Sequence, residues 1–466
     1  MSTPTIQDDM FAQSRDKRLL KQAQTYANEY IDGINARHVF PADAALQALR
    51  VFHEPMPAEP ASGEDILALL NEYGSPATVA HTGGRYFGFV NGGVLPAALA
   101  AKWLADAWDQ NAALYLTSPI ASELEGICED WLVDLLGLPA GSVAGFVTGT
   151  SSATLCGLAA GRNELLRRLG WDVNTEGLFG APPLRVVLGA QAHATVGKAL
   201  GVLGLGKARV EVVLSDAQGR LIPSQMPTLD ERCLVVAQAG NVNSGAFDDF
   251  VEIGDCVQRA GAWLHVDGAF GLWAAASGNQ QHLTRGVDLA DSWSVDAHKT
   301  LNAPYDCGVV LCKHRGALVG AMETSASYIL SDGLRDGMHM TLDMSRRARA
   351  IELWATLKAL GKSGVQDLVD RLCSHAQLMA SSLASRGFRI MNDVVFNQVL
   401  VACDTPEETQ TTLARLQKGG ECWCGGAVWH DEPVIRISIC SWATTRADVE
   451  RSVKAFAETR DSQRRA

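Results

Sequence analysis

Six short apolar runs constrain the fold of this chain more than any other feature. They lie at 184–189, 209–215, 233–240, 263–270, 292–298 and 307–313. Most are rich in Val and Leu, and helical or Gly-rich stretches separate one run from the next. Continuous apolar strands that alternate with helices are typical of a mainly parallel sheet covered on both faces. The sequence therefore predicts an α/β fold in this region.

The segments on either side have a different pattern. The N-terminal part contains helical stretches broken by the Pro-rich segment 53–63. A long helical pattern begins at Met344, and a strand at 434–441 and a terminal helix from about Arg446 follow it. We therefore expect an N-terminal helical segment at 1–95, a large domain at 96–350 and a small C-terminal α/β domain at 351–466.

Charge and hydropathy limit the expected partners. The chain has 40 Lys and Arg against 52 Asp and Glu, a formal charge of -12, with no basic block that could follow a nucleic-acid backbone. No apolar run approaches the roughly 20 residues that span a bilayer. The polar N-terminus resembles neither a secretory signal nor an Arg-rich transit peptide. We expect a cytoplasmic protein that binds neither nucleic acid nor membrane.

The cysteines favour a reducing compartment. Most of the 11 lie inside apolar stretches, as small core residues do. Cys422 and Cys424 form one close pair, but no second Cys/His pair at zinc-like spacing lies nearby. No metal site is predicted.

The segment 294–308, SVDAHKTLNAPYDCG, holds the most informative residue. Lys299 follows an apolar strand, and a buried ammonium there needs a partner or a function as a neutral amine or imine. His298 beside it is a donor that can reach a phosphate or carboxylate. Taken alone, this short pattern favours a solvated loop, so a functional interpretation depends on the rest of the chain.

Polar residues follow other strands of the predicted sheet. Asp267 comes after an apolar strand, where a buried carboxylate needs a cation, such as a pyridinium, or a helix cap. His193 follows 184–189 and fits either a ring-stacking role or a helix cap. The segment 145–170 runs from Gly and hydroxyl residues into a helix, which favours a phosphate or a simple cap. Parallel sheets bind ligands beyond the carboxyl ends of their strands.

Together these pieces are similar in order and spacing to a known family. The chain resembles the group II pyridoxal-phosphate-dependent amino-acid decarboxylases, which include the aromatic-L-amino-acid and glutamate decarboxylases. The matching motifs lie at 81–93, 118–139, 263–271, 296–300 and 435–450. The resemblance implies the fold-type-I arrangement of aspartate aminotransferase, pyridoxal 5'-phosphate as cofactor, and a homodimer with its active site at the subunit interface.

The resemblance also implies roles for individual residues. Lys299 would be the Schiff-base lysine, Asp267 the partner of the pyridine nitrogen, and His193 the ring that stacks on the cofactor. Ala269 would lie under the cofactor ring. The residues that would hold the phosphate are Thr150, Ser151, Asp296 and His298. The residues that would contact substrate are Asn91, Gly92 and Arg436.

The implied reaction is decarboxylation of an L-amino acid to the amine and carbon dioxide. An aldehyde-forming oxidative deaminase, another fold-type-I aminotransferase or lyase, and a catalytically silent scaffold are the alternatives. The family carries a proton-donating tyrosine on a mobile loop, whereas 331–344 here contains none. We assign Tyr328, just before that stretch, to its structural flank, which leaves His339 as the titratable donor in the loop.

Two further departures concern the cofactor pocket. Where the family has Gly-Thr-Thr near the phenolic oxygen of the cofactor, this chain has Val242 between Asn241 and Asn243, either of which could replace the hydrogen bond. Thr300 stands where the family usually has Trp. The segment 81–93 contains no cluster of basic residues, which disfavours an acidic substrate; aromatic and medium-sized polar amino acids remain open.

Overall fold

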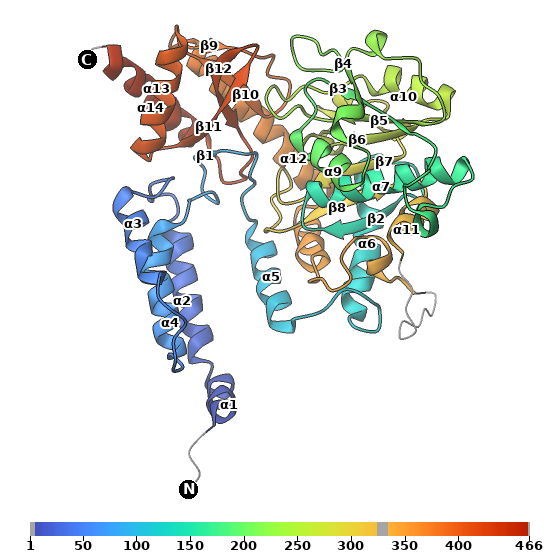
Figure 1. Cartoon of the computed structure of the whole chain (residues 1–466). Coiled ribbons are helices and arrows are strands. Elements are labelled where there is room, and N and C mark those ends of the chain that lie inside the picture. Colours follow the sequence, from blue (N-terminus) through green and yellow to red (C-terminus); the bar gives the residue numbers. More distant parts are fainter. Residues whose placement is uncertain (1–4, 324–333, 465–466) are drawn as a thin grey trace.

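The structure is a computed structural model that describes residues 5–323 and 334–464. Two sheets organise the chain: a seven-stranded sheet in the middle of the sequence and a five-stranded sheet near its C-terminus (Figure 1). Four N-terminal helices stand apart from both sheets (Figure 1).

The seven-stranded sheet contains all six of the predicted strands. Its order is β2-β8-β7-β6-β5-β3-β4, and only β8 is antiparallel to its neighbours. The bounds are β2 Val143–Val147, β3 Arg185–Gly189, β4 Val210–Val213, β5 Cys233–Gln238, β6 Trp263–Asp267, β7 Ser292–Asp296 and β8 Gly308–Cys312. The prediction of a mainly parallel α/β sheet is confirmed. Strand β2 was not predicted, because its small residues lead directly into a helix.

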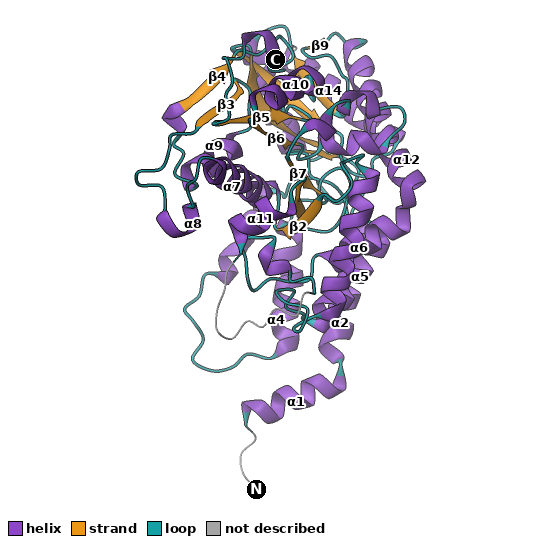
Figure 2. Cartoon of the chain, turned by 90° about the vertical axis from the view of Figure 1, so that its right-hand side faces the viewer, coloured by secondary structure: helices purple, strands orange, loops and turns teal. Residues whose placement is uncertain are grey.

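Helices cover both faces of this sheet. Val186 and Leu188 of β3 face a core shared with α7 (Thr150–Arg168), α9 (Ala194–Val202) and α11 (Arg315–Met322). Val187 between them faces the opposite core, to which α6 (Pro119–Leu135), α10 (Phe250–Ala260) and α12 (Ala350–Ala384) contribute. Figure 2 shows α7 and α9 on one side of the strands and α10 on the other. Burial on both faces explains why these strands are continuously apolar.

The C-terminal sheet has the order β1-β11-β12-β10-β9. Its strands are β1 Tyr86–Phe87, β9 Arg389–Ile390, β10 Gln398–Ala402, β11 Trp423–Trp429 and β12 Glu432–Ser438, packed against α13 (Pro406–Gly419) and α14 (Arg446–Arg464). Strand β1 comes from the N-terminal segment and pairs in parallel with β11. This pairing, not expected from sequence, ties the segment before α5 (Pro96–Trp108) to the C-terminal sheet.

The long helix differs from its prediction at the N-terminal end. It begins at Ala350 rather than Met344, because Arg346 and Arg347 before it form ion pairs with Glu125 and Asp306 instead of continuing the helix. Inside α12, Gly361 has φ 60° and ψ 178°, so the helix is interrupted there before it reaches the C-terminal sheet.

The N-terminal helices contain no buried residue. They are α1 Ile6–Asp16, α2 Arg18–Gly33, α3 Asp43–Ala48 and α4 Gly63–Leu69. Apolar side chains such as Phe11 and Leu20 are exposed to solvent in the single chain. None of the helices in the described ranges is long and apolar enough to cross a membrane.

Candidate active site

Lys299 and two aspartates meet beyond the carboxyl ends of adjacent strands. Asp267 ends β6 and Asp296 ends β7, and these strands pair in parallel. The chain then turns, and the Nζ atom of Lys299 lies 2.9 Å from Oδ2 of Asp296. Parallel packing therefore brings together side chains that are separated by about 30 residues in sequence, at the edge where such sheets bind ligands.

Asp296 is held from two sides. Thr150 at the start of α7 donates its backbone N–H to Oδ1 of Asp296 at 2.6 Å, and its hydroxyl donates to Oδ2. Burial alone would raise the pKa of Asp296, but Lys299, His298 and the Thr150 hydroxyl outweigh burial and lower that pKa. Asp296 is therefore an anion that caps α7 and holds the lysine amine.

This arrangement bears on the predicted phosphate contacts. A carboxylate that already faces Lys299 and Thr150 repels a phosphate, so its partners indicate that Asp296 positions these two residues. Ser151 on the first turn of α7 is exposed, and Gly149 before it lies beside the His298 ring. The N-terminus of α7 thus keeps donors open to an anion.

The carboxylate of Asp267 is buried, and few nearby groups stabilise its negative charge. Its Oδ1 accepts the backbone N–H of Ala269 at 3.2 Å, and no other donor among the described residues reaches the carboxylate. Burial raises the pKa of Asp267, while the charges of His193 and Lys299 lower it by smaller amounts. A carboxylate in this state favours a cationic or hydrogen-bonding partner.

His193 is both a helix cap and a member of the cluster. It is the N-cap of α9, and its Nδ1 lies 2.7 Å from the Thr195 hydroxyl. Burial lowers the pKa of His193, and the charge of Asp267 opposes that shift. The neutral ring therefore has Nδ1 engaged by the cap, and its Nε2 has no hydrogen-bond partner among the described residues.

His298 is fixed in one tautomer. Its Nδ1 accepts the backbone N–H of Cys307 at 3.1 Å, so the ring proton lies on Nε2, the nitrogen on the Asp296 side. Burial lowers its pKa. The ring stacks on Tyr305, with centroids 4.2 Å apart. Tyr305 was not singled out from sequence, although it lies in the same segment as Lys299.

Asn91 and Gly92 reach this site from the N-terminal segment. Gly92 donates its backbone N–H to the carbonyl of His298 at 3.2 Å. A Cβ atom on Gly92 would lie 2.1 Å from the Lys299 carbonyl, so only glycine fits here. Asn91 accepts a hydrogen bond from the Tyr305 hydroxyl at 2.9 Å. The predicted substrate segment therefore packs directly on the lysine turn.

Arg436 approaches from strand β12. Its Nη1 lies 3.4 Å from Oδ1 of Asn243, and its buried Nε has no acceptor in the described part of the chain. Its charge also lowers the pKa of His193, which places it near the cluster. Asn241 instead closes its own turn by accepting from the backbone of Asn243 and Ser244. Of the two asparagines, Asn243 thus faces the charged group.

Three other residues were interpreted from sequence: His339, Tyr328 and Thr300. His339 lies in the short helix η9 (Gly337–His339), which contacts α11, and no interaction within the described ranges joins it to Lys299, Asp267 or His193. Tyr328 lies outside the described residues. Thr300 is fully buried and donates its hydroxyl to the Phe270 carbonyl at 2.9 Å.

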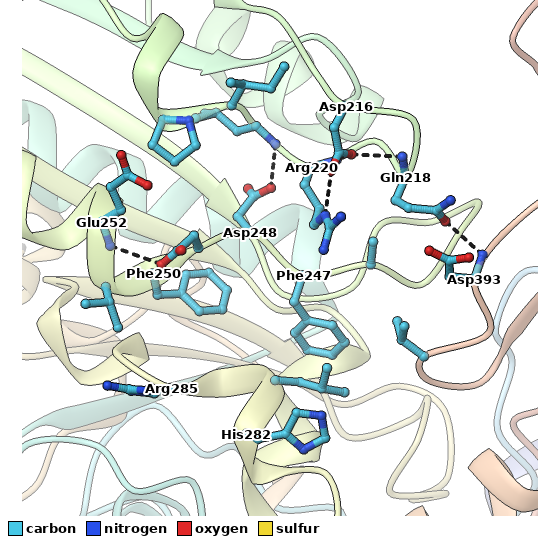
Figure 3. A pocket seen from close by; sticks show the side chains of 18 of the residues that line it. Asp216, Gln218, Arg220, Phe247, Asp248, Phe250, Glu252, His282, Arg285 and Asp393 are labelled. Atoms are coloured by element: carbon cyan, nitrogen blue, oxygen red, sulfur yellow. Dashed lines mark hydrogen bonds and ion pairs between the residues drawn. The ribbon is translucent and has the colours of Figure 1, made fainter.

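A large cavity of about 960 Å³ lies elsewhere, beside α10 and the loop 246–249 that leads into it (Figure 3). None of the predicted site residues lines it. Asp216 pairs with Arg220, and Gln218 accepts from the backbone of Asp393 (Figure 3). Asp248 accepts the backbone N–H groups of Leu221 and Gln238. None of the residues that line this cavity is a lysine, so it lacks the amine that the predicted chemistry needs and does not compete with the lysine cluster as the active site.

Comparison with known proteins decides the family. The model of the pyridoxal-dependent decarboxylase conserved domain matches residues 49–402. The chain belongs to the pyridoxal-dependent decarboxylase family. It is 31% identical over 457 residues to the aromatic-L-amino-acid decarboxylase of Sus scrofa, covering 91% of this chain and 92% of that one. The sequence-based resemblance is confirmed, and the protein is an amino-acid decarboxylase that uses pyridoxal phosphate.

Solved structures support the fold. Oryza sativa TDC with PLP and tryptamine has a TM-score of 0.89 at 22% identity, covering 99% of this chain and 100% of that one. Rhodiola rosea 4-hydroxyphenylacetaldehyde synthase has a TM-score of 0.83 at 23% identity, covering 97% and 98%. The fold-type-I prediction is confirmed.

The residues of this decarboxylase fit pyridoxal phosphate. Lys299 supplies an amine, and Asp267 supplies a buried carboxylate that accepts one hydrogen bond. The N-terminus of α7 supplies an exposed hydroxyl from Ser151. These groups match the aldehyde, the ring nitrogen and the phosphate of the cofactor in turn. The Nε of Arg436 supplies a further donor without an acceptor.

Proposed function

We propose that this decarboxylase acts on an L-amino acid with an aromatic or other uncharged side chain. The observation that supports this is the substrate segment: Arg85 is its one basic residue besides His81, and its guanidinium is committed to Asp448 and to backbone carbonyls. No free cation in that segment can therefore bind an acidic side chain. Similarity to an aromatic-L-amino-acid decarboxylase points the same way.

The test is a panel of amino acids incubated with purified holoenzyme, with amine, carbon dioxide, aldehyde and ammonia all measured. We expect amine and carbon dioxide in equal amounts from aromatic substrates and little turnover of glutamate or aspartate. A preference for the acidic substrates would overturn the substrate class. Aldehyde and ammonia as main products would favour the aldehyde-forming alternative, an activity that the Rhodiola rosea relative carries in its name.

Each residue of the cluster would have a different role in the reaction. Pyridoxal phosphate, when bound, takes up the electron pair of the bond that breaks at the substrate Cα. Lys299 would hold the cofactor, His193 and Ala269 would lie on its two faces, and Asp267 would face its ring nitrogen. Thr150, Ser151 and His298 would hold the phosphate end, with Asp296 keeping Thr150 and Lys299 in place. These roles fix the orientation that selects which Cα bond breaks.

Arg436 would bind the substrate carboxylate, since its unpaired, buried Nε favours an anion. In Arg436→Gln, the loss of one charge-assisted hydrogen bond, roughly 1.5–3 kcal/mol, should raise KM by about 10- to 150-fold. The cofactor absorbance should stay unchanged, and steady-state kinetics with a spectrum of each variant would check both. A KM equal to that of the parent enzyme would exclude this role.

No interaction within the described ranges joins His339 to the lysine cluster of its own chain, so its role as a proton donor stays a prediction. We expect His339→Phe to form amine at a rate within about twofold of the parent enzyme, because no described contact joins this half-buried histidine to the lysine cluster of its own chain. Single-turnover amine formation would measure this. A large loss of amine without loss of bound cofactor would restore the proton-donor role.

A homodimer is proposed as the working form. The exposed apolar residues of α1 and α2, such as Ile6, Met10 and Phe11, leave these helices without a core in the single chain. Removal of residues 1–34 should lower the measured mass in light scattering from two chains to one; a truncated protein that keeps the parent's mass would contradict a dimer built by these helices. A cytoplasmic location also stays a prediction. It is supported by the 11 cysteines, which are all free, as is usual in a reducing compartment.

A further inference from the structure

Asn302 is the most heavily hydrogen-bonded side chain beside the lysine turn. It is fully buried and has φ 61°, a left-handed conformation that asparagine adopts more readily than most residues. Its Oδ1 accepts the backbone N–H groups of Gly93 at 2.5 Å and Trp442 at 2.9 Å. Its Nδ2 donates to the carbonyls of Lys299 at 3.3 Å, Thr300 at 2.8 Å and Cys440 at 2.9 Å.

These bonds join three distant parts of the chain. Gly93 belongs to the segment that carries Asn91 and Gly92, and Cys440 and Trp442 follow strand β12 with Arg436. Both segments are fastened to the turn that begins at Lys299. The backbone of Asn302 forms further hydrogen bonds within the turn and to the substrate segment. Its N–H donates to the Lys299 carbonyl at 2.9 Å, and its carbonyl accepts the N–H of Leu95 at 3.2 Å.

The position of the Lys299 amine depends on where this turn holds the Lys299 backbone. Asp296 fixes its Nζ atom at 2.9 Å, while Asn302 holds the carbonyl at the other end of the same residue. With both ends held, the amine is limited to a small range of positions relative to Asp267 and Arg436. Reactions of this kind are sensitive to displacements of about 1 Å.

We propose that Asn302 is a positioning residue: its carboxamide sets the place of the Lys299 backbone relative to the substrate segment and the C-terminal sheet. It acts through Lys299 and touches no reacting atom. This inference rests on the proposed role of Lys299 as the residue that bonds to the cofactor.

The test compares two isosteric substitutions. Asn302→Asp keeps the shape and the acceptor but removes the donor to the three carbonyls. Asn392→Asp is the matched control, because Asn392 is also buried, donates to the carbonyls of Ser244 and Gln398, and accepts from the Leu400 backbone. These partners lie in strand β10 and in the turn at Ser244, outside the stretches 91–95, 299–302 and 440–442 that the Asn302 side chain and backbone join.

Two readouts separate positioning from stability. The first is the rate at which added pyridoxal phosphate attaches to cofactor-free enzyme, trapped with borohydride and located by peptide mass spectrometry. The second is kcat against KM. We expect both variants to lose thermal stability, but only Asn302→Asp to attach cofactor and turn over about 10- to 100-fold more slowly, with KM within about twofold.

Equal attachment rates and kcat in the two variants would overturn the inference and leave Asn302 with a structural role alone. If Asn302→Asp does not fold, Asn302→Gly takes its place, since glycine accepts the positive φ and lacks the carboxamide; the same outcomes apply. The proposed function is checked separately by the parent enzyme, in which trapping at a lysine other than Lys299 would refute the role of Lys299 itself.

Discussion

Substituting Lys299 by alanine should abolish the visible absorbance of lysine-bound cofactor and lower kcat on the order of 10⁴-fold or more. The amine at 2.9 Å from Asp296 is the nucleophile that this cluster presents, and alanine leaves no replacement for it. Absorbance spectra of enzyme purified with excess pyridoxal phosphate, together with amine release, measure both effects.

Two controls make the result specific. Lys454→Ala removes an exposed lysine on α14 that forms an ion pair with Glu458, and it should keep the spectrum and the activity. Thermal unfolding of Lys299→Ala without cofactor should resemble that of cofactor-free parent enzyme, since the change does not open the core. An unaltered spectrum in Lys299→Ala would mean that another amine holds the cofactor.

The seven-stranded sheet was predictable because strands that are buried on both faces are recognised in the sequence as continuous apolar runs. Strands such as β5 (Cys233–Gln238) lie between two helical layers, and this strand is buried at every position and apolar in all but its last residue. Strand β1 is different: two residues, Tyr86 and Phe87, gain their partners from β11, more than 300 positions later. Pairing at that distance has no local signal, so the link between the N-terminal segment and the C-terminal sheet required the structure.

The site was predictable where it depends on strand ends. Asp267 and Lys299 follow neighbouring parallel strands, so their meeting follows from the α/β pattern. The bonds of Asp296 were not predictable, because its partner Thr150 lies 146 residues away and a carboxylate next to a phosphate motif fits several roles. Asn302 and Tyr305 were missed for a similar reason, since a single sequence does not distinguish a hydrogen-bonded turn residue from a solvated one.

Asp267 should matter for chemistry far more than for cofactor retention. In Asp267→Asn, the side chain keeps its size and still can accept from Ala269, but it no longer supplies a negative charge to a protonated ring nitrogen. Removing one preorganised electrostatic partner typically costs about 10²–10³-fold in kcat, which is the loss we expect, while cofactor attached at Lys299 remains visible in the spectrum.

The control for Asp267→Asn is a second buried aspartate of the same domain. Asp248 accepts the backbone N–H groups of Leu221 and Gln238, and burial raises its pKa to about 6. Asp248→Asn should therefore lower the free energy of unfolding without a comparable loss of kcat, because it lies in the separate cavity (Figure 3). If the two variants lose kcat equally, the effect of Asp267 is one of folding, and the ring nitrogen has its partner elsewhere.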